Sequence, residues 1–127
     1  MEATSKQTVW LGRTLSGLVA AFLALDAVMK LVLVTPVVEA TERLGYPIAT
    51  ARPLGLVLLA STILSLVPRT QVIGALLVTA YLGGATATHV RVGDPFWFPI
   101  AMGVLLWAGL VLRTPRLRAL ISAPSAA

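Results

Sequence analysis

Four long apolar stretches, separated by short polar breaks, dominate the hydrophobic pattern of the chain. They cover about residues 9–34, 48–67, 71–92 and 96–112. Each approaches the roughly 20 residues that a helix needs to cross the hydrocarbon core of a bilayer. A lipid-exposed span must satisfy its own backbone hydrogen bonds, which a helix does. The pattern therefore predicts an all-α, polytopic membrane four-helix bundle that forms one transmembrane domain over residues 1–127.

Proline and glycine mark the breaks between the spans. They fall at Thr35-Pro36, Gly45-Tyr46-Pro47, Pro68-Arg69 and Gly93-Asp94-Pro95. Residues 36–47 are too short and too charged to span, because Glu39, Glu42 and Arg43 stand among the apolar positions. This segment is predicted to lie as an amphipathic piece at the membrane interface.

Small residues recur every four positions in the first span, at Gly12, Ser16, Ala20 and Ala24. Such a stripe lets another helix approach closely, so a packing role is predicted. The same span could be mistaken for a secretory signal, because basic residues precede a Leu/Ala-rich run. The run leads into charged positions and then resumes, which favours a helix leaving the bilayer over a cleavage region.

Composition supports a membrane protein. Hydrophobic residues make up 57% of the chain and charged residues 12%, with a mean hydropathy of +0.90. A soluble domain has about 45–50% apolar and 25% charged residues. The chain has no cysteine, which excludes disulfides, thiolate metal sites and thiol redox chemistry within it. The basic residues are spread among apolar spans rather than clustered on one face, so nucleic acid is not an expected partner.

Charge is distributed unequally between the two sides that four spans define. The terminal side carries six basic residues and one acidic residue, and the other side carries four of each. The whole net charge of +5 therefore falls on the side of the termini. Because positive loops stay on the cytoplasmic side, both termini are predicted to be cytoplasmic.

Polar residues converge on one layer near the outer ends of three spans. Helices rise about 1.5 Å per residue, so Asp26 lies about 24 Å and Thr86 about 22 Å beyond the inner interface. Lys30 and His89 come out at about 30 Å and about 27 Å on the same scale. The candidate ligand-binding layer consists of Asp26, Lys30, Arg52, Tyr81, Thr86, Thr88, His89, Arg91 and Trp97.

Asp26 is the residue whose position most needs a partner, because a charge at mid-membrane costs about 2.5–3.5 kcal/mol. Lys30 lies one helical turn beyond it. A local pair, with Lys30 extended toward the interface, explains both residues without any function. Alternatively, Asp26 orients His89 or Arg91 across the bundle and makes a polar floor under an apolar pocket. The sequence leaves both interpretations open.

No metal or redox centre is predicted. The single histidine cannot ligate a haem from both sides, and a metal site built on His89 with Asp26 would have too few ligands. Gly83-Gly84 lies inside an apolar helix rather than after a strand, which indicates close helix packing instead of a phosphate loop. The chain is therefore expected to be non-catalytic on its own.

Several short motifs recur in a characteristic order along residues 10–120. They are Gly12-Arg13, Lys30, Leu44-Gly45-Tyr46-Pro47, Pro68-Arg69-Thr70, the segment 84–91 and Leu112-Arg113. With these motifs in this order, the chain resembles the DoxX-like family of small four-helix membrane proteins. The resemblance implies a bacterial cytoplasmic membrane protein. Better-known relatives act as membrane subunits of oxidoreductase assemblies, including thiosulfate oxidation that reduces quinone, and others help to assemble membrane proteins. Many relatives carry an acidic residue in the second span, where this chain has only apolar residues over 54–59.

Two functional hypotheses from different classes follow. The first is a non-catalytic scaffold or assembly component that holds membrane or redox protein partners, or further copies of itself. The second is a subunit that binds a lipophilic ligand, a quinone or a lipid. Thr86, Thr88 and His89 would supply hydrogen-bond donors to a quinone, Arg91 or Lys30 would stabilise a partly reduced oxygen, and Tyr81 or Trp97 would cover the ring. A transport role would require oligomers, because the layer lies at one end of the spans.

Overall fold

The computed structural model describes residues 2–122, with side chains from Ser5 onward, and every regular element in that part is helical. The long helices are α1 (Glu2–Val32), α3 (Ala51–Leu66), α4 (Gln71–Val92) and α5 (Trp97–Arg113). Helix α2 (Thr35–Arg43) and the 3-10 turn η1 (Ile48–Thr50) connect α1 to α3, and α6 (Pro115–Ser122) follows α5. The all-α prediction is confirmed.

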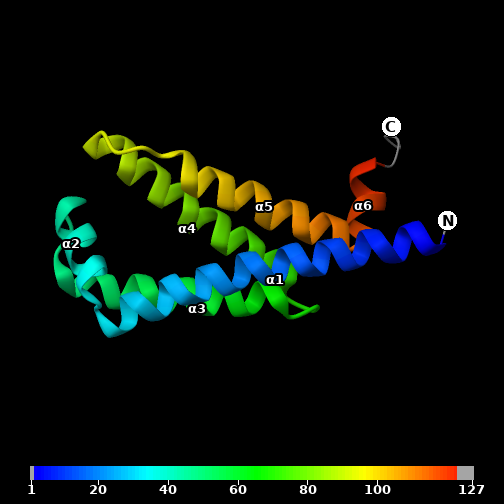
Figure 1. Cartoon of the computed structure of the whole chain (residues 1–127), viewed down its shortest axis with the longest axis horizontal. Coiled ribbons are helices and arrows are strands. Elements are labelled where there is room, and N and C mark those ends of the chain that lie inside the picture. Colours follow the sequence, from blue (N-terminus) through cyan, green and yellow to red (C-terminus); the bar gives the residue numbers. More distant parts are fainter. Residues whose placement is uncertain (1, 123–127) are drawn as a thin grey trace.

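The long helices pack in the order of the chain. α1 contacts α3 and α5, and α4 contacts the same two helices, so α1 and α4 lie diagonally opposite. Figure 1 shows α1 with α3 as one pair and α4 with α5 as another, close together near α6 and diverging toward α2. The start of α1 and α6 share the narrow end, and α2 lies across the wide end.

Small residues bring α1 and α5 together at the narrow end. A Cβ added to Gly12 would collide with the backbone of Arg113, and one added to Gly109 would lie 2.6 Å from Ser16 Oγ. Ser16 and Ala20 are also buried. The stripe predicted from the spacing of small residues therefore packs as expected, and its partner is α5.

The contact between α3 and α4 depends on one glycine in the same way. A Cβ added to Gly74 would collide with the backbone of Ser65. Ser61, Thr62 and Ser65 are buried on α3, and each hydroxyl donates to a carbonyl of its own helix at 2.6–2.7 Å. These hydroxyls are therefore satisfied without any partner from another helix.

Apolar side chains from all four long helices fill the centre. Leu58 of α3 and Val78 of α4 are completely buried, and Leu110 of α5 is 1% exposed. The other members of this core are Val19, Leu23, Ala27, Ala75, Leu82, Met102 and Leu106.

The outward faces of the helices are apolar as well. Leu18, Leu56, Ile73 and Val104 are each at least 59% exposed, a surface that suits lipid rather than water. Residues 5–32, 48–66 and 71–92 are long and apolar enough to cross a membrane. α5 has 17 residues and meets that test only together with α6, from which it is bent by 102°.

The structure changes several boundaries. α1 begins at Glu2 rather than near residue 9, and the left-handed backbone of Leu33, with a φ of 55°, follows its last residue. Of the predicted interfacial segment 36–47, only the part up to Arg43 is helical, in α2. α6 was not predicted, because its arginines were interpreted only as the end of a span.

Two predictions about glycines have opposite outcomes. Gly93 ends α4 with a φ of 77°, as the Gly-Asp-Pro break indicated. The prediction that Gly83 and Gly84 pack closely against another helix is wrong, because a Cβ at either position would meet nothing within 4 Å. These two glycines lie on the exposed surface of α4.

Candidate functional site

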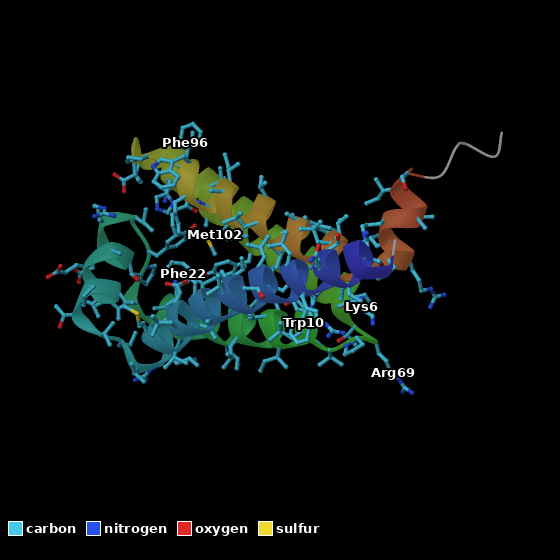
Figure 2. The ribbon with its side chains drawn as sticks, turned by 45° about the vertical axis from the view of Figure 1, so that its right-hand side comes forward. Lys6, Trp10, Phe22, Arg69, Phe96 and Met102 are labelled. Carbon is cyan, nitrogen blue, oxygen red and sulfur yellow. The ribbon has the colours of Figure 1, made fainter. Side chains whose placement is uncertain are left out.

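A cavity of about 550 Å³ lies at the wide end, lined by α1, α2, α4, α5 and the start of α3. Most of its lining is apolar. Phe22 of α1 and Phe98 of α5 meet across it, with ring centroids 5.2 Å apart and planes inclined by 60°. Figure 2 shows Phe22 and Met102 in the space between the two helix pairs, whereas Phe96 lies outside it. The cavity could therefore hold the apolar body of a ligand.

Three polar residues belong to the cavity lining, namely Asp26 and Lys30 of α1 and Tyr81 of α4. Lys30 Nζ donates to Asp26 Oδ2 at 2.5 Å, and their side chains are 20% and 35% exposed. The Tyr81 hydroxyl makes no hydrogen bond within the part of the chain that the structure describes, so it can donate to a ligand.

The local Asp26–Lys30 pair is one of the two interpretations left open by the sequence, and it is the one present here. Among the described residues, Asp26 makes no hydrogen bond to His89 or to Arg91. A carboxylate has several acceptor sites, however, and one of them remains available beside the lysine. The pair therefore does not prevent the carboxylate from contacting a ligand.

His89, which lies on α4 like Tyr81, adds an acceptor to the cavity lining. Its Nδ1 lies 2.7 Å from the carbonyl oxygen of Ala85. A carbonyl can only accept, so Nδ1 carries the hydrogen, and Nε2 of the neutral ring is an acceptor. The sequence hypothesis used His89 as a donor to a quinone. With one hydrogen held on Nδ1, the His89 ring could donate from Nε2 only if both of its nitrogens were protonated.

Two side chains of α4 hold the segment that covers the mouth of the cavity. Thr88 donates to Gly84 O at 2.8 Å, so the 3.0 Å contact with Tyr46 is a hydrogen bond donated by the tyrosine hydroxyl. Arg91 Nη2 donates to Leu44 O at 2.6 Å, and its guanidinium lies 5.9 Å from the centre of the Tyr46 ring. The end of α2 is thereby fixed to α4.

An ion pair adds to this connection. Arg43 Nε at the end of α2 lies 3.1 Å from Asp94 Oδ2 beyond the end of α4. The arginine side chain is 64% exposed, so the pair contributes only about 0–1 kcal/mol. Gly45, with a φ of 85°, lets the chain turn between these contacts and η1.

The predicted polar layer is brought together only in part. Five of its nine residues line the cavity: Asp26, Lys30, Tyr81, Thr88 and His89. Arg91 lies beside the mouth and binds the backbone of the covering segment. A smaller set of side chains than the predicted nine therefore faces the enclosed space.

Three predicted site residues point elsewhere. Arg52 donates to Leu31 O at 3.1 Å and is exposed. Thr86 donates to its own helix at Leu82 O and lines a separate groove between α4 and α5. Trp97 is 66% exposed and contacts the edge of Phe98. None of the three lines the cavity.

Sequence reasoning missed several lining residues, among them Phe22, Thr41, Arg43, Tyr46, Phe98 and Met102. The aromatic run at 96–98 was interpreted only as an interface anchor. Phe22 carried a usable signal, because it lies four residues before Asp26 and so on the same helix face. Residues of α2 carried none, since nothing local indicates that this helix covers the bundle.

The arrangement suits the binding of an amphiphilic molecule. Within residues 5–122 no three His, Cys, Asp or Glu side chains gather as a metal site would require. The cavity lining includes donors on Lys30 and Tyr81 and an acceptor on His89, and the rest of it is mainly apolar. Such a set can hold the polar head of an amphiphilic molecule while its body contacts the aromatic rings.

Comparison with known proteins identifies the family. A search of curated proteins found no match, and neither did a search of solved structures. The sequence profile of the DoxX-like family matches residues 14–112, which include α3, α4, most of α1 and all of α5 except Arg113, together with the polar residues of the cavity. The chain belongs to the DoxX-like family.

Proposed function

We propose that this protein crosses the bacterial cytoplasmic membrane as a four-helix bundle and binds a lipophilic small molecule with a polar head in its cavity. The observation that carries the proposal is the cavity itself, about 550 Å³ and mainly apolar with a few polar side chains in its lining. This volume lies within the roughly 300–1,000 Å³ of small-molecule sites. A quinone or a lipid has the required combination of head and body.

The head of the ligand would lie between Tyr81, Lys30 and His89. A carbonyl oxygen would accept from the tyrosine hydroxyl or the lysine ammonium, and a hydroxyl would donate to the free imidazole nitrogen. A ring would lie against Phe22 and Phe98, which already contact each other across the cavity. The orientation of the bundle, with the cavity on the outer side, rests on the charge distribution.

The test is stabilisation of the purified protein by an added short-chain quinone, combined with solvent extraction and mass spectrometry of copurified ligands. A ligand that binds only the folded form at 100 times its Kd stabilises it by about 2.7 kcal/mol. Ala85→Phe should abolish this effect, because Ala85 lines the cavity. Ala87→Phe, on the exposed surface of the same helix, should retain it.

A second candidate function is a scaffold or assembly component, the interpretation that the sequence favoured. The exposed Gly83 supports it, because a glycine on the outer surface of a membrane helix lets a partner helix approach closely. If no quinone or lipid is extracted and neither shifts the unfolding temperature of the wild type, the binding proposal should be abandoned for this one. Photocrosslinking from position 83 would then test for a membrane partner or a second copy.

A further inference from the structure

Most of the basic residues lie toward the narrow end of the bundle, opposite the cavity. Six of the ten belong to this set: Lys6, Arg13, Arg69, Arg113, Arg116 and Arg118. Figure 2 shows Lys6 and Arg69 at this end, on different elements. Both ion pairs among the described residues lie at the wide end. The narrow end therefore carries positive charge without a described acidic partner.

Two of these arginines are partly enclosed and incompletely bonded. Arg113 Nη2 donates to Ser65 O at 2.6 Å, which fixes its guanidinium against the end of α3. The Nε atoms of Arg113 and Arg118 are buried and have no hydrogen-bond partner among the described atoms. An unpaired buried N–H of a charged group favours an acceptor, and an anionic oxygen is the strongest available type.

Helix α6 supplies an apolar surface between its own arginines. Successive residues turn by about 100°, so Leu117, Leu120 and Ile121 share one face and the arginines at 116 and 118 flank it. Leu117 packs against the core, while Leu120 and Ile121 are 75% and 64% exposed. The second turn of α6 therefore extends the same apolar face beyond the bundle.

The direction of α6 places this face against lipid. α6 is bent by 102° from α5, so it runs parallel to the membrane surface if α5 crosses the membrane. Leu117 then points toward the bilayer interior, and its neighbours on the same face point toward acyl chains outside the bundle. Basic residues beside such a face contact the headgroup layer.

We propose that α6 and the arginines around it form a binding site for an anionic phospholipid. Arg113, Arg116 and Arg118 would contact the phosphate, and the acyl chains would lie along Leu120 and Ile121. The proposal depends on the membrane placement of the helices but not on the cavity at the other end. Failure of quinone binding would leave it unaffected.

The experiment adds phosphatidylglycerol, phosphatidylcholine or inorganic phosphate to the full-length protein in mild detergent. Bound lipid is counted by native mass spectrometry, and the unfolding temperature is measured in parallel. We expect retention of phosphatidylglycerol over phosphatidylcholine, with no comparable effect of inorganic phosphate. A single Lys or Arg near an anionic membrane surface contributes about 1 kcal/mol, so Arg118→Gln should reduce retention about five-fold.

Two further variants keep the test decisive. Arg52→Gln removes one exposed positive charge from the other end and should leave retention unchanged. Arg116→Gln replaces an exposed side chain, so it reports on the site even if Arg118→Gln fails to fold. Leu120→Ser should weaken retention of the lipid without any change in charge.

Three results would overturn the proposal. Equal retention of the two lipids would remove the preference for an anionic head. If Arg116→Gln and Arg52→Gln lost the same amount of phosphatidylglycerol retention, the net charge of the protein would explain the binding without a site at α6. If inorganic phosphate alone raised the unfolding temperature as much as phosphatidylglycerol does, the site would bind a free anion and acyl-chain contacts would not be needed.

Discussion

Replacing Lys30 by methionine should destabilise the protein much more than replacing Asp26 by asparagine. The two side chains are joined at 2.5 Å and are mostly enclosed. Lys30→Met leaves the Asp26 carboxylate without its ion-pair partner in a mainly apolar cavity. Orphaned buried charges cost about 3–5 kcal/mol, and we expect about 2–3 kcal/mol because the Asp26 side chain retains 35% exposure.

Asp26→Asn leaves a different situation. The amide oxygen can still accept from the ammonium group, and Lys30 can extend toward the interface. We expect a loss of about 1 kcal/mol, the usual value of one hydrogen bond. The double variant should be more stable than Lys30→Met alone, because it removes both the charge and its partner.

The measurement is reversible unfolding in mixed detergent micelles, followed by tryptophan fluorescence. His89→Ala serves as the comparison, because the only described hydrogen bond of His89 is to a carbonyl of its own helix. This variant should lose less than about 1 kcal/mol of unfolding free energy. A larger loss for Asp26→Asn than for Lys30→Met would contradict the reasoning. It would mean that the carboxylate is held by a group other than Lys30.

Two further predictions concern packing and topology. Gly74→Ala should lower the free energy of unfolding by at least about 2 kcal/mol, because its Cβ would meet the backbone of α3. Gly83→Ala should be neutral or raise that free energy by up to about 1 kcal/mol, because its Cβ would meet nothing. Similar unfolding free energies for the two variants would contradict the observed contacts. A reporter fused after Ala127 should be active in the cytoplasm, since the net positive charge lies at that end; periplasmic activity would reverse the proposed orientation.

The positions of the helices could be predicted from the sequence because physical limits determine them. Bilayer thickness sets the length of an apolar stretch, and the Thr35-Pro36, Pro68-Arg69 and Gly-Asp-Pro breaks end the helices near the predicted residues. α6 was not predicted, because a segment of eight residues with two arginines is common after the cytoplasmic end of a membrane span. Only Pro115, which is favoured at the first turn of a helix, marked its start.

The candidate site was predictable in depth but not in direction. The rise per residue fixes how far along a helix a side chain lies, and Asp26 and Thr88, both in the predicted layer, line the same cavity. It does not fix the rotation of the helix. Thr86 and Thr88 are two residues apart and so point about 200° apart, and only Thr88 faces the cavity. Rotation is decided by packing, which contacts such as Gly74 with Ser65 determine.

Side-chain size along the bundle explains why the cavity of about 550 Å³ lies at the wide end. At the narrow end, Gly12, Gly74 and Gly109 let backbones meet. At the wide end Phe22 and Phe98 meet ring to ring, so α1 and α5 cannot approach as closely there. In water such a space would tend to collapse, but between helices in lipid no hydrophobic force drives closure. The separation then persists, and the contacts of α2 with α4 cover it without filling it.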